Sequence, residues 1–484
     1  MSLSDPKFLV LLAVTVMAFY LLRGHRPRAA LLLGVSYAFY FKLSGYFAAV
    51  LIFVTAISYA GGWLLSPNRK TAYRGWLFAL LAFLVLLPLM TFKYLGFLLS
   101  VAATIVGQNA APALPGMLLI LPIGISFFTF VALGYLSDVY LEVIEPETRL
   151  LEFALLLAFF PVVTAGPIER AGHFLPQFDF SKTYFSSERA FAASRLIFTG
   201  LFLKIVCADA LIKPVDTIFT DPSNFIAPEK LYALIYFMYY AYADFAGYSL
   251  IAIGSALFFG LEVLPNFHQP FLSTTVAEFW RNWHISMSSW FRDYVFTPLR
   301  MHWRRYPTAG MTGALMIAFL LIGIWHGAGW GFVLFGTTHG LLVASSALTL
   351  KYRENIRGRL HIPAAVVRLN GIICTFILVL LTLVLYRANS LYDAEDIYRD
   401  LFSKNILSIE PYLHPEMFKV IGIKSWSWAI VGLVIVGDIL TRREFSLEKF
   451  PIAAQLVIYN VGAALIAYGW IAQSAAQPFL YYRF

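Results

Sequence analysis

Residues 308–350 read TAGMTGALMIAFLLIGIWHGAGWGFVLFGTTHGLLVASSALTL, and this stretch decides the class of fold. Its two apolar runs are each long enough to cross a hydrocarbon core of roughly 30 Å as a helix. Between them lies His326, followed by Gly327, Ala328 and Gly329. An ionisable residue at that depth is costly unless it is paired or used. His326 is therefore the first candidate functional residue, and a buried histidine bonded to helix backbone is the structural alternative.

The rest of the chain has the same apolar character. Of 484 residues, 60% are hydrophobic and only 13% are charged, and the mean hydropathy is +0.73, far outside the usual globular mix. The short alternating segments of a barrel are absent, so helices must satisfy the backbone amides within the bilayer. We expect an all-α, polytopic transmembrane bundle forming a single integral domain over residues 1–484. The expected spans lie near 6–22, 28–43, 46–65, 75–100, 117–140, 150–168, 190–212, 231–260, 308–325, 328–350, 363–386, 424–441 and 452–474.

Charge in the short loops predicts the orientation of these spans. When the helices alternate, the basic loops fall on one side, which should be the cytoplasm: Arg23/Arg26/Arg28, Arg69/Lys70/Arg74, Arg300/Arg304/Arg305, Lys351/Arg353/Arg357/Arg359 and Arg442/Arg443. The polar segment 387–423 and both termini are then expected to be extracytoplasmic. Loop orientation and attraction to anionic lipid explain the net charge of +9, so no nucleic-acid partner is predicted.

The segment from Pro265 to Arg305 is too rich in charge and large aromatic residues to cross lipid. Phe279, Trp283 and Met287 recur at four-residue spacing, whereas charged residues interrupt the apolar surface. This pattern predicts an interfacial or re-entrant helix. A juxtamembrane anchor with an aromatic belt is the alternative. His284 lies in the same segment, and non-helical backbone at membrane depth must be buried in protein or line a watery cavity.

Two intramembrane histidines favour proton-transfer chemistry. A neutral imidazole can deprotonate a hydroxyl group as that group attacks an acyl carbonyl, and it can also relay protons. The nine histidines show no HxH or HxxxH spacing, so no metal site is predicted. A G-x-S-x-G nucleophile motif is absent as well. The residues alone leave acyl transfer and proton relay open.

Several motifs in order resemble the membrane-bound O-acyltransferase (MBOAT) family, in particular its bacterial alginate O-acetyltransferase-like branch. They cover about 120–390 and are Leu121–Phe127, Ala165–Ile168, Tyr242–Ser249, Pro265–Phe267, Glu278–Ser286, Phe291–Val295, Trp325–Gly327, Gly336–Gly340 and Tyr386–Ala388. The resemblance implies a multi-pass protein of the bacterial inner membrane, with helices around a central funnel. It also implies His326 as the catalytic residue and His284 as its companion.

The resemblance and the local sequence together give further candidates for substrate contact. Asn282 and the turn 327–329 are candidate oxyanion donors, and Trp325 is expected at the funnel wall. Asp244 and Tyr248 are expected to hydrogen bond across helices or to contact substrate. His339 matches the second His-Gly motif, although Thr337-Thr338 precedes it where members of the family often carry an aromatic or Leu-Tyr pair.

The implied reaction needs no bound cofactor. An acyl-CoA, expected to be acetyl-CoA, would donate the acyl group to an extracytoplasmic hydroxyl for exopolysaccharide O-acetylation. The acceptor would be an exported polysaccharide or a serine-hydrolase-like partner acetyltransferase. The sequence leaves open which acceptor is used, whether the group is acetyl, whether an acyl-enzyme forms and the oligomeric state.

Two other functions compete with acyl transfer. A proton-coupled transporter could use His284 and His326 as a relay, with the re-entrant segment as a gate. The two halves of the chain, however, show no corresponding broken helices. A catalytically silent scaffold for polymer export is the third candidate.

Overall fold

The computed structural model describes residues 2–67, 73–107, 114–407, 427–442, 450–472 and 479–482. These residues form helices, turns and loops without a β-strand, and an isolated antiparallel bridge pairs Phe267 with Trp283. The prediction of an all-α fold is confirmed.

The chain divides into two compact units. The first contains Met1–Thr199 and Tyr248–Pro265, and the second contains Gly200–Gly247 and Asn266–Phe484. The chain passes from one unit to the other within α9 (Ser187–Leu201), within α11 (Ala227–Leu257) and between Pro265 and Asn266. That a single integral domain spans residues 1–484 stays a prediction.

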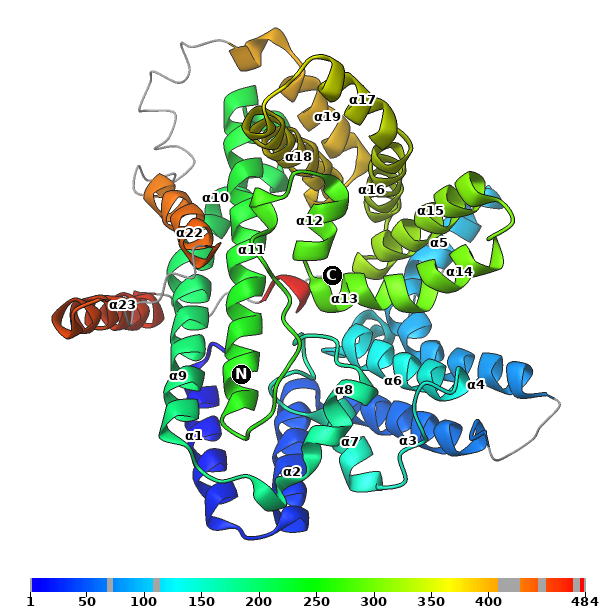
Figure 1. The fold of residues 1–484 in the computed structure, drawn as a ribbon, viewed down its shortest axis with the longest axis vertical. Coiled ribbons are helices and arrows are strands. Elements are labelled where there is room, and N and C mark those ends of the chain that lie inside the picture. The colour runs from blue at the N-terminus through cyan, green and yellow to red at the C-terminus, as the bar shows by residue number, and fades with distance from the viewer. Residues whose placement is uncertain are drawn as a thin grey trace. The chain divides into compact units, whose positions relative to one another are not determined.

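The first unit contains the helices of the N-terminal part of the chain (Figure 1). They are α1 (Pro6–Leu21), α2 (His25–Ser44), α3 (Ala48–Leu64), α4 (Arg74–Leu89), α5 (Leu95–Ile105), α6 (Ile125–Tyr140), α7 (Leu150–Ala158) and α8 (Ala171–Phe174). Short 3-10 or π turns lie at Gly45–Phe47, Met90–Tyr94, Gly116–Leu119, Leu175–Phe178 and Phe180–Lys182.

Two predicted spans in this unit are shorter than expected. The span over 117–140 begins as a helix only at Ile125, because Pro122 lacks a backbone donor and Gly124 adopts φ 76° against the Val163 carbonyl. The predicted span over 150–168 is wrong. Helix α7 has 9 residues, and at roughly 1.5 Å per residue it covers only about half of a hydrocarbon core.

The second unit contains the remaining helices, and π-helical turns interrupt two of its helical runs. The helices are α10 (Asp209–Thr220), α12 (Val276–Asn282), α13 (Ile285–Phe291), α14 (Thr297–His302), α15 (Pro307–His326), α16 (Trp330–Leu348), α17 (Leu350–Arg359), α18 (Ala364–Arg387), α19 (Leu391–Leu401), α22 (Ser427–Arg442) and α23 (Ile452–Ala472). The short turns are Phe202–Ala208 (π), Pro222–Asn224, Pro270–Leu272, Arg292–Phe296 (π), Lys404–Leu407 and Leu480–Tyr482.

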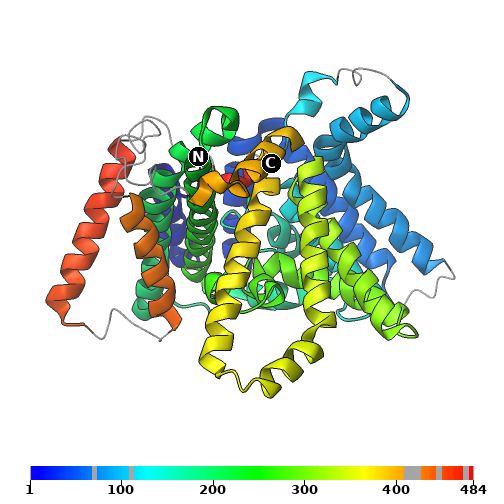
Figure 2. The same cartoon turned by 90° about the horizontal axis from the view of Figure 1, so that it is seen from above.

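Small residues bring α15 and α16 together. A Cβ on Gly323 would meet the backbone of Phe332 and Gly336, and one on Gly336 would meet the Phe319 carbonyl. This close approach fixes the hairpin that ends α15 at His326. Helix α18 packs beside α16, and α17 leads from one to the other (Figure 2).

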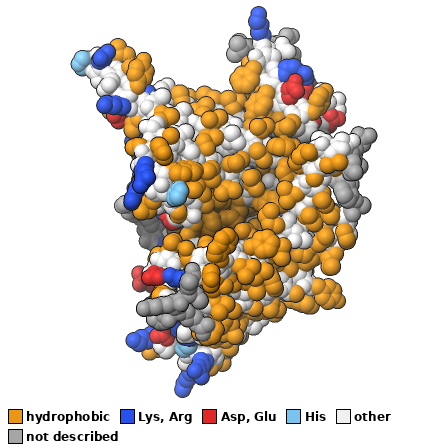
Figure 3. Space-filling model, turned by 90° about the vertical axis from the view of Figure 1, so that its right-hand side faces the viewer, with side chains coloured by type: hydrophobic (Ala, Val, Ile, Leu, Met, Phe, Trp, Pro, Cys, Tyr) orange, Lys and Arg blue, Asp and Glu red, His pale blue; other side chains and the backbone are white. Residues whose placement is uncertain are grey.

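Six helical stretches of the described chain are long and apolar enough to cross a membrane. They are His25–Leu64, Arg74–Ile105, Pro307–His326, Trp330–Leu348, Ala364–Arg387 and Ile452–Ala472. Figure 3 shows a face that is dominated by hydrophobic side chains. Helix α4 also exposes the large hydrophobic residues Trp76, Leu80 and Phe83. A chain with such helices is a multi-pass membrane protein.

The aromatic and charged segment Pro265–Arg305 and the polar segment 387–423 both differ from ordinary membrane spans. Helices α12, α13 and α14 have 7, 7 and 6 residues, so none can cross a bilayer alone.

The predicted polar segment 387–423 contains α19, whose Asp396 and Asp400 pair with Lys230 of α11 at 2.6 and 2.5 Å. Residues 408–423, including Glu410, Glu416 and Lys419, lie outside the described residues.

Candidate active site

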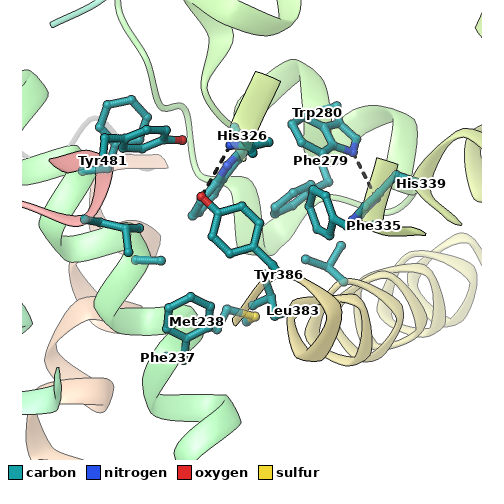
Figure 4. Close-up of a pocket in the computed structure, with 15 residues that line it drawn as sticks. Phe237, Met238, Phe279, Trp280, His326, Phe335, His339, Leu383, Tyr386 and Tyr481 are labelled. Atoms are coloured by element: carbon teal, nitrogen blue, oxygen red, sulfur yellow. Dashed lines mark hydrogen bonds between the residues drawn. The ribbon is translucent and has the colours of Figure 1, made fainter. Parts of the chain in front are cut away.

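His326 and His339 both line a small cavity in the second unit (Figure 4). It leaves about 30 Å³ for the centres of water-sized molecules, which is room for two or so such groups. Aromatic and aliphatic side chains surround it, including Phe237, Met238 and Phe335. The site is therefore an apolar chamber with a few polar atoms placed at fixed points.

His326 is the last residue of α15, and 3% of it is exposed. Its Nδ1 lies 3.4 Å from the hydroxyl oxygen of Tyr386. The rings of Trp325, Phe335 and Tyr386 surround the imidazole with centroids 5.1 to 5.9 Å away. When Nδ1–H of His326 donates a hydrogen bond to the Tyr386 oxygen, the basic lone pair of the imidazole is on Nε2.

His284 is fully buried between α12 and α13 in a left-handed conformation, with φ 45° and ψ 53°. Such backbone is uncommon for a non-glycine residue and persists only where its surroundings hold it. The Asn266 carbonyl accepts from Ile285 N at 2.9 Å, and Asn266 Oδ1 accepts from Ser286 Oγ at 2.6 Å and lies 3.3 Å from His284 Nδ1. Because Oδ1 can only accept, the contact assigns the proton to Nδ1 of His284.

The structure brings the two predicted catalytic histidines into one aromatic cluster. The Trp325 ring lies 5.5 Å from His284 and 5.1 Å from His326. Trp325 is 2% exposed, so its position between the imidazoles agrees with the expected wall residue. A contact with substrate stays a prediction.

His339 differs from both because neighbouring side chains engage both of its ring nitrogens. Trp280 Nε1 donates to Nδ1 at 3.1 Å, and Nε2 lies 2.9 Å from Thr382 Oγ1. The Thr382 hydroxyl donates to the Val379 carbonyl at 2.7 Å, so it accepts from His339 Nε2. His339 thereby joins α12, α16 and α18. Substrate contact by His339 stays a prediction.

Asn282 and Asp244 are held by other groups and do not line the cavity. The Asn282 side-chain amide donates to Ser273 Oγ at 3.1 Å. Asp244 pairs with Lys204 at 2.6 Å and accepts from Leu480 N at 2.8 Å. These contacts fix a loop and the C-terminal segment. Substrate contact by either residue stays a prediction.

Tyr248 belongs to the first unit. It is buried, and its hydroxyl hydrogen bonds with that of Thr164, directly before the Ala165-Gly166-Pro167 motif. The structure does not place Tyr248 among the residues that line the His326 cavity. Substrate binding by this residue stays a prediction.

Sequence reasoning missed two tyrosines of the site. Tyr386 lies beside His326, and Arg387 next to it donates to Asp216 at 2.8 Å, which anchors the end of α18. Tyr481 lies on the cavity wall near both histidines. The available signals were the Tyr-Arg-Ala sequence at 386–388 and the aromatic residues within 479–482. Neither signal predicts that these tyrosines lie near His326.

The turn between α15 and α16 contains two glycines in different surroundings. A Cβ on Gly327 would overlap the Phe332 ring, whereas one on Gly329 would meet a Phe332 atom only at 3.8 Å. Both residues have extended backbone. Close packing, not a left-handed conformation, therefore requires glycine at 327.

A second cavity in the same unit shares Trp280 with the first. It leaves about 380 Å³ for water-sized molecules, and its walls include Phe319, Arg281 and Arg292. Both arginines are exposed, and Arg292 pairs with Asp293 at 2.8 Å. Two arginines at an apolar hollow suit a ligand with an apolar part and an anionic part.

The known proteins that this chain resembles have names that describe acyl transfer to a polymer. The probable alginate O-acetylase of Pseudomonas aeruginosa is 33% identical over 83% of this chain and 75% of its own length. The peptidoglycan O-acetyltransferase of Helicobacter pylori is 29% identical over 60% of this chain and 58% of its own. The teichoic acid D-alanyltransferase of Bacillus subtilis is 28% identical over 62% of this chain and 75% of its own length.

The match to a family description covers the three histidines discussed above. Residues 126–384 fit the MBOAT, membrane-bound O-acyltransferase family, and this range includes His284, His326 and His339. The range is more than half of the chain, and it agrees with the resemblance in the motifs. The chain is therefore an O-acyltransferase of the membrane-bound O-acyltransferase family.

Proposed function

We propose that this enzyme moves a short acyl group, expected to be acetyl, from a cytosolic thioester to a hydroxyl group of an exported polymer. In this proposal His326 is the general base and His284 is its companion. The supporting observation is that Nδ1 of each imidazole lies near an oxygen that can accept a hydrogen bond from Nδ1–H, that of Tyr386 for His326 and that of Asn266 for His284. Such a contact directs basicity to Nε2.

The relatives support a polymeric acceptor. Their names concern acetylation of alginate and peptidoglycan and D-alanylation of teichoic acid. We propose an exported polysaccharide as the acceptor, reached directly or through a serine-hydrolase-like partner. Membership of an acyltransferase family argues against the transporter alternative.

The second cavity supports a route for the thioester. A coenzyme A donor carries phosphates, and Arg281 and Arg292 could bind them while the acyl end points towards Trp280. Trp280 contacts Phe319 and Phe335 with ring centroids 5.5 and 6.3 Å away. We propose that this aromatic partition moves when the donor is bound, and that the cavities together form the funnel with α12 and α13 as its re-entrant wall.

The chemistry requires one proton to move twice. Nε2 of His326 takes the proton of the acceptor hydroxyl as its oxygen attacks the acyl carbonyl carbon. The C–S bond then breaks, and the leaving thiolate takes that proton from the imidazolium. First-turn N–H groups of α16, which follows His326 in the sequence, are candidate oxyanion donors because a helix N-terminus presents backbone N–H groups. Asn282 is a weaker candidate because its amide already donates to Ser273.

The size of the His326 cavity supports a short acyl group. Space for about two water-sized groups fits an acetyl methyl and carbonyl, not a long chain. Met238, Phe335 and Leu383 limit this space.

Purified enzyme in detergent tests the proposal directly. Acetyl-CoA and alginate oligosaccharides are the probes, with thiol release reporting donor cleavage and ester formation reporting transfer. Wild-type protein should release thiol, and His326→Ala should lose about 10²–10⁴-fold in rate. Activity of a folded His326→Ala variant near that of wild type would remove His326 from the mechanism.

Labelling of single cysteines tests the direction of transfer. Arg359 and Glu395 are exposed and flank α18, so one span separates them. In a background without Cys207 and Cys374, Arg359→Cys should be protected from an impermeant reagent in intact cells, and Glu395→Cys should react. The opposite pattern would reverse the proposed orientation, in which both termini are extracytoplasmic.

A further inference from the structure

The C-terminal segment Phe479–Tyr482 brings an aromatic hydroxyl to the histidines. The Tyr481 ring lies 5.7 Å from His284, 6.0 Å from His326 and 5.9 Å from Trp325, measured between centroids. Figure 4 shows Tyr481 beside His326 and Tyr386 at the cavity. A residue more than 150 positions from His326 in sequence thus completes the wall of the site.

Buried interactions anchor this segment. Leu480 N donates to Asp244 Oδ2 at 2.8 Å, and Phe479 and Leu480 are buried. Lys204 pairs with Asp244 at 2.6 Å and with Asp209 at 2.8 Å, which offsets the charge of the buried Asp244 carboxylate. The segment therefore has a defined place next to α11.

Two tyrosines lie against His326. Tyr481 and Tyr386 line the same cavity, and their ring centroids are 6.0 and 5.1 Å from that of His326. The Tyr386 oxygen lies 3.4 Å from His326 Nδ1. A phenol oxygen can accept one hydrogen bond while its O–H group donates another. When Tyr386 donates to Tyr481, its oxygen is oriented to accept from Nδ1 of His326.

We propose that Tyr481 is a positioning residue for acyl transfer: it holds the Tyr386 hydroxyl so that His326 carries its proton on Nδ1 and presents Nε2 to the acceptor hydroxyl. The inference rests on the proposed role of His326 as the base. Both tyrosines remain neutral phenols throughout, since the transferred proton goes from the acceptor hydroxyl to Nε2 and then to the leaving thiolate. The corresponding logic orients the histidine of a serine-protease triad.

A double-mutant cycle tests this linkage in the full-length enzyme, with thiol release from acetyl-CoA as the readout. Tyr386→Phe should lower kcat by about 10–100-fold and Tyr481→Phe by about 10-fold, because loss of an orienting partner typically has effects of this size. The KM for acetyl-CoA should change little. The double variant should be no slower than Tyr386→Phe, because Tyr481 acts through Tyr386.

The control is Tyr468→Phe, because Tyr468 is exposed on α23, and it should leave kcat unchanged. Thermal stability in detergent is measured for each variant. An unchanged kcat in Tyr481→Phe, or effects that multiply in the double variant, would overturn the inference. So would a deletion of residues 479–484 that folds and keeps full activity.

The same assay separates two failures. If His326→Ala stays active, the proposed function fails and this inference falls with it. If His326→Ala is inactive while Tyr481→Phe keeps wild-type kcat, only the role of Tyr481 is wrong.

Discussion

His326 and His339 line the same cavity from neighbouring helices and are both buried, yet their hydrogen-bonding partners differ. His339 is held through both ring nitrogens by Trp280 and Thr382, as a strut between helices would be. His326 has Tyr386 at Nδ1 and lies in a cluster with Trp325, His284 and Tyr481. Burial alone therefore does not identify a catalytic histidine, and the partners of each ring nitrogen are more informative.

The largest expected effect comes from making the same substitution at both histidines. A glutamine can accept from Trp280 and donate to Thr382, so His339→Gln should keep most activity and stability. Glutamine has no basic nitrogen, so His326→Gln should lose about 10²–10⁴-fold in rate. Thiol release from acetyl-CoA and thermal unfolding in detergent measure the two properties.

The matched variant His339→Ala separates structure from chemistry. It leaves the buried Trp280 Nε1 without its present acceptor, which costs about 1–3 kcal/mol. We expect a lower unfolding temperature and partial activity. Equal loss of activity in His326→Gln and His339→Gln, with both proteins folded, would abolish the distinction.

The next effect concerns the glycines that follow His326. Gly327→Leu should destabilise the protein by about 1–3 kcal/mol, because overpacking forces side chains and backbone to shift, and Phe332 already occupies the Cβ position. Gly329→Leu should unfold at a temperature near that of wild type while acyl transfer falls. Thermal unfolding and thiol release should diverge only for Gly329→Leu, and full activity of that variant would argue against access along this turn.

Sequence patterns predicted the membrane class and the long apolar helices such as α15, α16 and α18, because hydrophobic periodicity is a property of contiguous residues. The catalytic role of His326 and His284 stays a prediction. The patterns did not predict the end of α7, because Phe159, Phe160 and Val162 remain buried in an irregular segment that is as apolar as a helix. They also did not reveal Tyr481, whose position depends on the contact between Asp244 and Leu480 N across 236 positions.

Asp244 and Asn282 illustrate the same limit. Both occur in sequences that resemble family motifs, and the structure gives both a polar partner outside the cavity. A sequence motif indicates that a polar residue has a role, but the kind of role depends on which atoms the fold places next to that residue. For Asp244 those atoms include Lys204 Nζ and the backbone of the C-terminal segment.

A smaller effect should appear in the choice of acyl group. Met238→Ala enlarges the cavity on the wall that Phe237 and Ala241 also form. Use of butyryl-CoA relative to acetyl-CoA should rise about 10-fold, because an added methylene in a fitted pocket is worth about 1–3 kcal/mol. Met301→Ala is the control, since Met301 is exposed on α14. An unchanged preference would place the acyl group outside this cavity.

The smallest expected effect concerns His173 in the first unit, an exposed histidine that contrasts with the buried ones. Its Nδ1 lies 3.0 Å from Glu169 Oε2, and this hydrogen bond, assisted by the charge of Glu262, raises the pKa of His173 above its usual value of 6.5. The protonated form is thus favoured in the folded protein. The resulting stability is fully present below pH 6.5 and is lost as the pH rises through the raised pKa.

Solvent screening limits this contribution to less than about 1 kcal/mol, since 38% of the His173 side chain is exposed. The unfolding temperature of wild-type protein should therefore fall slightly more between pH 6 and about pH 8 than that of His173→Gln, within the range where histidines titrate. Glu169 keeps its bond to Leu264 N at 2.7 Å in either protein, so the loop itself should remain. His302→Gln, at an exposed position on α14, should follow wild type. If His173→Gln also follows wild type at every pH, the Glu169 contact adds nothing to stability, and partners at a ring nitrogen matter only where burial excludes water.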